Sequence, residues 1–127
     1  MLLIYNDQSL LDALPKGEFD SRMRHCLAHA DDLKDRGKLL DSQILGPPSA
    51  AKSVRIRDGR QTTLDGPFTE TKEMIAGFNV VEADNIDEAV RMAAEFPWAR
   101  TGCIEVRPMQ SFDDVRKQVG APSAPRK

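Results

Sequence analysis

Residues 74–108 read MIAGFNVVEADNIDEAVRMAAEFPWARTGCIEVRP and divide into an apolar run, an amphipathic segment and an alternating run. The apolar run, residues 74–83, is typical of a buried strand. In the amphipathic segment Asn85 can cap a helix, and Glu88 completes a capping box. Residues 101–107 alternate between apolar and polar side chains, which predicts a second strand, and prolines end both the helix and this strand. The order is therefore strand, helix, strand.

The same order occurs nearer the N-terminus. Residues 1–6 are a short apolar run that predicts a strand, and residues 38–45 predict another, ended by the turn residues 46–48. Residues 19–36 between them predict a helix, for which Gly37 supplies the stop. Its apolar residues recur at steps of three and four, as core packing requires: Phe19, Met23, Cys26, Leu27, Ala30 and Leu33.

A hairpin is predicted between the two units. Residues 54–57 alternate apolar and basic side chains, Asp58-Gly59 is typical of a two-residue turn, and residues 61–65 form the return strand. Right-handed crossovers place both helices on one face of a single sheet. The sequence therefore predicts an α+β fold, a ferredoxin-like βαββαβ unit with an inserted β-hairpin.

The second face of this sheet must meet solvent or a partner. On this uncovered face we expect the last strand to carry Cys103, Glu105 and Arg107, and the middle strand to carry Asn79 and Val81. Such a mixture suits a wet cavity between two sheets. We therefore expect a homodimer that packs sheet toward sheet.

The chain has 127 residues, enough for one domain with a core of its own. We assign residues 1–112 to this domain and residues 113–127 to a C-terminal extension that is at least partly flexible. The formal net charge of -2 lacks the basic excess that nucleic-acid binding usually requires. Two cysteines are too few for a disulfide framework, and neither a signal peptide nor a membrane-spanning run is visible. We expect a cytoplasmic protein with no membrane or nucleic-acid partner.

Residues 65–73 read DGPFTETKE and are followed by Gly77-Phe78 and by Glu82-Ala83-Asp84. This pattern resembles the signature of the YCII-related family, specifically its DGPF branch, and the similarity extends over residues 1–112. The resemblance implies a dimeric α+β barrel of ferredoxin-like subunits, in a family whose biochemical activity is not established. Because members sometimes occur together with extracytoplasmic-function sigma factors, it also implies a regulatory or stress-linked setting.

Asp65 opens the DGPF loop and has two readings. It can act as a general base, or it can accept backbone hydrogen bonds in an Asx-turn, which is the more common role. Phe68 can cover a ligand pocket or plug the joint with a dimer partner. Glu70 and Lys72 can orient a ligand, although charges two apart in a polar loop are usually solvated.

Simpler members of the family resemble enzymes in which a histidine on the first helix approaches an aspartate, a pair suited to proton transfer. His25 and His29 are the candidates in this chain, and which of them matches stays open. Their spacing with Asp32 also suits a metal, but no fourth ligand is evident and we expect none. The structural alternative places both histidines on the solvated flank of the helix.

The remaining candidates lie on the last strand and the first helix. Arg107 can clamp an anionic ligand or pair with Glu105 across the dimer, and pairing is the more common role. Cys26 is expected in the core as a small hydrophobic residue, whereas Cys103 shares a face with Arg107, whose guanidinium would favour a thiolate there.

Together these features predict a homodimer that binds a small polar or aromatic molecule in a cleft where the DGPF loop meets the uncovered sheet face. The sequence has no phosphate-binding loop or nucleophile elbow, so we expect no cofactor. Whether it is an enzyme stays open: acid–base chemistry would use Asp65 as base, a histidine as acid or orienter, and Arg107 as anion clamp. The alternative is a non-enzymatic regulatory module that contacts another protein, such as a sigma factor.

Overall fold

A computed structural model describes residues 1–125 of the chain. Its strands and helices, in chain order, are β1 (Leu2–Asp7), α1 (Gln8–Asp12), α2 (Glu18–Asp35), β2 (Leu39–Ile44), β3 (Lys52–Arg57), β4 (Arg60–Asp65), β5 (Glu73–Val81), α3 (Ile86–Ala94), β6 (Gly102–Val106) and α4 (Phe112–Val119). Two short 3-10 helices cover Pro48–Ala50 and Pro97–Arg100. Within residues 1–125, no helix has the length and apolar composition needed to cross a membrane.

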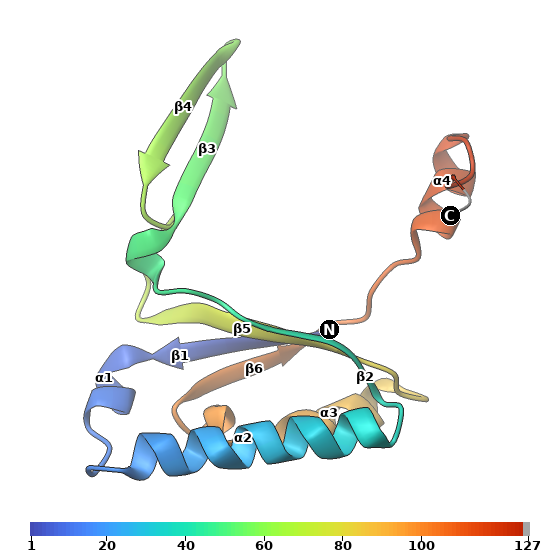
Figure 1. Ribbon diagram of the computed structural model, residues 1–127. Helices are drawn as coiled ribbons and strands as arrows, with labels where there is room; N and C mark the ends of the chain where they lie inside the picture. Colours follow the sequence, from blue (N-terminus) through green and yellow to red (C-terminus); the bar gives the residue numbers. More distant parts are fainter. Residues whose placement is uncertain (126–127) are drawn as a thin grey trace.

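Four strands form one sheet in the order β2-β5-β1-β6, and every pair of neighbours is antiparallel. Both α2 and α3 lie on the same side of this sheet (Figure 1). β3 and β4 pair only with each other and form a separate two-stranded hairpin. This arrangement is α+β and consistent with the predicted ferredoxin-like fold with an inserted hairpin.

The core lies between the sheet and the two long helices. Its buried side chains come from β1, α2, α3 and the turn that follows α3: Leu2, Leu33, Met92, Ala93 and Phe96. The predicted capping box fixes the start of α3, because Asn85 Oδ1 accepts from the Glu88 backbone N–H at 2.9 Å. The Glu88 carboxylate in turn accepts from the Asp84 N–H at 3.2 Å, one residue earlier than in the standard motif.

The strand register decides which side chains occupy the uncovered face. Leu3 stands opposite Phe78 and Glu105, and Tyr5 stands opposite Cys103, so this face has an apolar centre with polar groups on β6. Asn79 stands opposite Leu2, which is in the core, and is only 3% exposed. The expectation that Asn79 and Val81 face outward was therefore wrong: both point toward the helices, where Val81 packs on the core.

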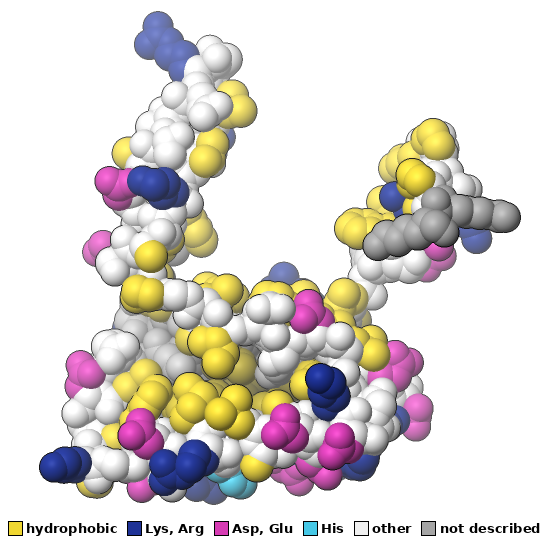
Figure 2. All heavy atoms as spheres, in the orientation of Figure 1, with side chains coloured by type: hydrophobic (Ala, Val, Ile, Leu, Met, Phe, Trp, Pro, Cys, Tyr) yellow, Lys and Arg dark blue, Asp and Glu magenta, His cyan; other side chains and the backbone are white. Residues whose placement is uncertain are grey.

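Two segments project from the uncovered side of the sheet, at opposite ends of it (Figure 1). One is the β3–β4 hairpin and the other is α4, which begins where the sequence predicted only an extension. Ser111 caps α4 by accepting from the backbone of Asp113 and Asp114, and Gly120 ends it at φ 68°. We call these segments the two arms. Their apolar side chains are strongly exposed (Figure 2), among them Val54, Ile56, Leu64, Phe112 and Val119.

Candidate functional site

The predicted residues of the DGPF loop lie in solvent. Asp65 ends β4 with its side chain 86% exposed, and its Oδ1 accepts from Lys52 Nζ at 2.5 Å. Phe68 is 75% exposed, and Glu70 is exposed as well. Lys72 Nζ lies 3.6 Å from Oδ2 of Asp7, a buried carboxylate at the start of α1. The loop therefore joins the hairpin arm to β5 without enclosing a space of its own.

An open groove of about 490 Å³ runs beside this loop, along one strand of the arm. Pro67, Phe68 and the residues of β3 line it, including Arg55 and Arg57. This groove lies on the arm and not on the uncovered face of the sheet. A second open groove, of about 270 Å³, is lined by Pro67 of the loop and by Met74 and Ile75 of β5, and it is the nearer match to the predicted cleft.

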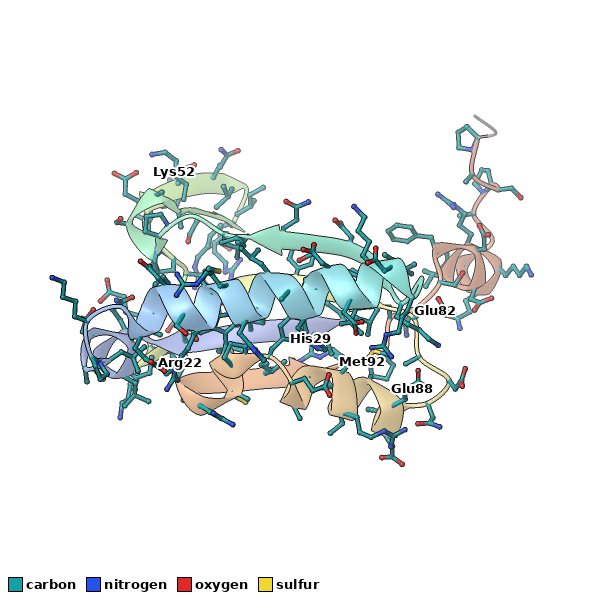
Figure 3. The ribbon with its side chains drawn as sticks, turned by 60° about the horizontal axis from the view of Figure 1, so that its bottom comes forward. Arg22, His29, Lys52, Glu82, Glu88 and Met92 are labelled. Atoms are coloured by element: carbon teal, nitrogen blue, oxygen red, sulfur yellow. The ribbon has the colours of Figure 1, made fainter. Side chains whose placement is uncertain are left out.

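The two predicted histidines lie elsewhere, between α2 and α3. His29 Nε2 is 3.0 Å from the Met92 carbonyl oxygen, and His25 Nε2 is 3.2 Å from the Glu95 carbonyl oxygen. Because a carbonyl can only accept, each imidazole N–H donates to the C-terminal end of α3, where the Met92 oxygen also accepts from the Glu95 backbone N–H at 3.4 Å. Figure 3 shows His29 beside Met92.

The environment of His29 corrects the expectation of a solvated flank. This side chain is buried, its ring meets Phe96 edge-on at 4.4 Å between centroids, and its Nδ1 is 3.4 Å from Glu95 Oε2. It is buried because α3 packs against that flank of α2. Neither histidine is brought together with Asp65, which lies on the arm on the opposite side of the sheet (Figure 1). Asp32 pairs with Arg36 at 3.1 Å.

Arg107 and Glu105 form an ion pair within the chain, with 2.7 Å between Nη2 and Oε2. The sequence favoured pairing of these two residues across the dimer, whereas this ion pair lies within one chain and leaves the Arg107 side chain 68% exposed. The two thiols differ: Cys103 is exposed on the uncovered face, whereas burial raises the pKa of the Cys26 thiol.

A cavity of about 180 Å³ lies between α2 and the side of the sheet that faces the helices. Every lining residue is uncharged, and the Cys26 thiol is the only ionisable side chain among them. Aromatic rings form one end: Phe19 and Trp98 lie 5.5 Å apart between centroids, and Phe96 is nearby in the core. The cavity is therefore an apolar chamber with aromatic walls.

Gln43 of β2 is among the lining residues, but its register with Phe78 places its side chain on the uncovered face. Three other polar side chains interrupt the apolar lining, one from each of three strands: Asn6 from β1, Ser42 from β2 and Asn79 from β5. Ser42 Oγ donates to Asn79 Oδ1 at 2.5 Å. Asn6 Oδ1 is buried and has no hydrogen-bond partner within residues 1–125. Buried polar atoms usually have hydrogen-bond partners, so an unpartnered one beside a cavity marks a position where a bound molecule could supply the partner.

The mouth of the cavity lies at the edge strand β2. Leu27, Ile44 and Leu45 line the cavity and are also exposed to solvent. Figure 2 shows hydrophobic side chains gathered between α2 and this edge of the sheet. A small molecule can therefore reach the cavity from this side without crossing the sheet.

Sequence reasoning selected none of the three polar residues as site residues. The available signal was their position: Asn6 ends one apolar run and Asn79 interrupts another. A polar residue in such a run is either at a sheet edge or facing a polar space inside the fold. The correct register of β5 would have placed Asn79 with Gly77 on the helix side.

Two comparisons with known proteins agree with one another. The model of the YCII-related domain family matches residues 1–113. The chain is also 37% identical over 113 residues to an uncharacterized protein of Rhizobium meliloti (strain 1021), with 87% of this chain and 91% of that protein covered. Both agree with the resemblance carried by the DGPF loop. The chain belongs to the YCII-related domain family.

Proposed function

We propose that this protein is a homodimer in which each subunit binds a small molecule in the cavity between α2 and the sheet. The observation that carries the proposal is the cavity itself, a largely apolar space of about 180 Å³ that opens at β2 and has a few polar groups in its wall. Small-molecule sites commonly combine apolar walls with a small number of placed polar groups. The two grooves that the DGPF loop lines are more open to solvent than this cavity, so we favour the cavity.

The homodimer is proposed from the apolar side chains on the uncovered side of the sheet. Leu3, Tyr5 and Phe78 share that face, and the arms beside it expose apolar side chains by 57–80%, from Leu64 to Phe112. A lone two-stranded hairpin is at best marginally stable in water, and large exposed apolar patches mark interaction sites. A second copy that packs on this face would bury the apolar side chains of the sheet and those of the arms.

We propose binding and not acid–base catalysis as the activity of the cavity. General acid–base chemistry needs a titratable group within hydrogen-bond reach of the reacting atom. Cys26 is the only such group in the cavity wall, and burial raises its pKa, so the thiol form dominates at neutral pH. Asp65, His25 and His29 do not line the cavity.

Native mass spectrometry of the gently purified protein tests both parts. We expect the mass of two chains, with small molecules bound to each. In Ala30→Phe the new ring fills the cavity and should remove them, whereas Ala28→Phe places the same ring on the exposed side of α2 and should keep them.

Three results would contradict the proposal. A single-chain mass at micromolar concentration would exclude the homodimer. Bound molecules that persist in a folded Ala30→Phe variant would place the binding site elsewhere. If the protein purifies empty, the wild type is screened against single-ring compounds by Trp98 fluorescence, and failure to bind any of them would exclude the cavity site.

A further inference from the structure

We infer that the ligand of this cavity is a neutral, single-ring molecule that carries a hydroxyl group. The inference rests on the proposed binding function and adds the chemical class of the ligand to it. Three properties of the cavity carry it: its volume, its lack of charged side chains and the hydrogen-bonding groups of Asn6, Ser42 and Asn79.

The volume of the cavity limits the size of the ligand. A cavity of roughly 150 Å³ in an apolar protein core is large enough to hold benzene. The cavity described above measures about 180 Å³, which leaves room for one ring and a small substituent. The rings of Phe19 and Trp98 at one end offer faces and edges against which an aromatic ring packs well.

The lining of the cavity determines which ligand charge it can accept. No Asp, Glu, Lys, Arg or His lines the cavity, so nothing there would compensate a carboxylate or an ammonium group that leaves water. A buried charge without a partner is strongly disfavoured. A neutral molecule avoids this penalty.

The polar side chains in the cavity wall indicate which substituent the ligand carries. Ser42 and Asn79 already bind each other, whereas Asn6 Oδ1 has no partner within residues 1–125. A hydroxyl can donate to an amide oxygen and can also accept from an amide N–H, so it suits either end of the Asn6 side chain. A ligand hydroxyl would thus supply the partner that the fold leaves out.

Four related compounds separate these properties. Benzyl alcohol carries a hydroxyl, toluene has no polar group, and at neutral pH benzoate is an anion and benzylamine is a cation. Trp98 is the one tryptophan of the chain and lines the cavity, so its fluorescence reports binding directly. We expect benzyl alcohol to bind about tenfold more tightly than toluene, because the net free energy of one hydrogen bond corresponds to about this ratio of dissociation constants. The two ions should bind more weakly than toluene.

Variants assign the preference to the proposed atoms. Asn6→Leu keeps a side chain of similar size, removes the amide and should make benzyl alcohol and toluene bind alike. Ser42→Ala should retain at least part of the preference for the alcohol. If Asn6→Leu fails to fold, as judged by circular dichroism, the four-compound series on the wild type decides alone.

The outcomes distinguish this inference from the proposed function. If benzoate or benzylamine binds as tightly as benzyl alcohol, or toluene binds equally well, the ligand class is wrong although the cavity binds small molecules. If none of the four compounds changes the fluorescence of the wild type or of Ala28→Phe, the inference is overturned; the proposed function then depends on the wider screen and on native mass spectrometry.

Discussion

His25 and His29 reach from α2 to the carbonyl oxygens at the end of α3. The last four carbonyls of a helix have no partner four residues further on within it, so tighter turns, side chains or water satisfy them. His29 does this from a buried position, whereas His25 is exposed. The residue type that suggested catalysis in the sequence therefore joins two helices in the structure.

This role predicts the effect of removing each imidazole. We expect His29→Ala to lower the free energy of unfolding by about 1–3 kcal/mol, because it removes a buried hydrogen bond to the Met92 carbonyl and opens space beside Phe96. His25→Ala should cost less than about 1 kcal/mol, because water can replace the exposed ring. Urea denaturation measures both, and equal stabilities for the two variants would refute the joining role of His29.

Glu88 gives α3 a dependence on pH. Hydrogen bonding from the Asp84 backbone N–H, and then from Lys38, lowers the pKa of the Glu88 carboxyl below its ordinary value of 4.5. Since the folded state prefers the ionised carboxylate, this stabilisation is present above pH 4.5 and is lost as pH falls through the lower pKa of the folded state.

The predicted consequence is a shallower acid response in Glu88→Gln. Between about pH 5 and pH 3 the wild type should lose more stability than this variant, because the amide cannot titrate. Asp87→Asn, at an exposed carboxylate in the same turn, is the control and should follow the wild type more closely. Urea denaturation across this range provides the measurement, and parallel curves for the wild type and Glu88→Gln would contradict the assignment.

At the scale of elements, sequence periodicity predicted both long helices, the four strands of the main sheet and the hairpin. These elements have strong local signals, such as the Asn85 cap and the Asp58-Gly59 turn, both of which the structure confirms. α4 was missed because it exposes its apolar side chains and packs on no core, so its short pattern carried little weight. The cavity could not be predicted, since it depends on the register that turns Asn79 toward α2.

The hairpin arm depends on its turn. Asp58 and Gly59 both have positive φ, 52° and 74°, as a type I′ turn requires. We predict that Gly59→Val strains this turn, loosens the arm and thereby weakens the proposed dimer, because the side chain of valine disfavours positive φ. Asp58→Asn keeps a residue suited to the turn and should leave association unchanged.

Sedimentation equilibrium of these two variants measures the contribution of the arm. A dissociation constant raised by about tenfold or more in Gly59→Val, with a wild-type value in Asp58→Asn, corresponds to at least about 1.4 kcal/mol of lost association energy. Unchanged association in Gly59→Val would mean that the arm takes no part in the dimer.

At the scale of the whole molecule, the sheet has one face covered by helices and one face bordered by the two arms (Figure 1). Cys103 lies on the second face and is exposed in the single chain, and Cys26 is half-buried on the other side. A Cys26→Ser variant therefore carries a single thiol that reports on the uncovered face alone. Its reactivity depends on whether that face is open to solvent.

We predict that Cys103 in this variant reacts slowly with a thiol reagent at high protein concentration and faster on dilution, because the second copy covers it only in the dimer. Adding Phe78→Asp places a charge at the centre of the proposed interface and should make the reaction fast at every concentration. Circular dichroism checks that this double variant still folds. A rate that is fast in the single variant and independent of concentration would show that the uncovered face stays open, and the homodimer would then have to form through another surface.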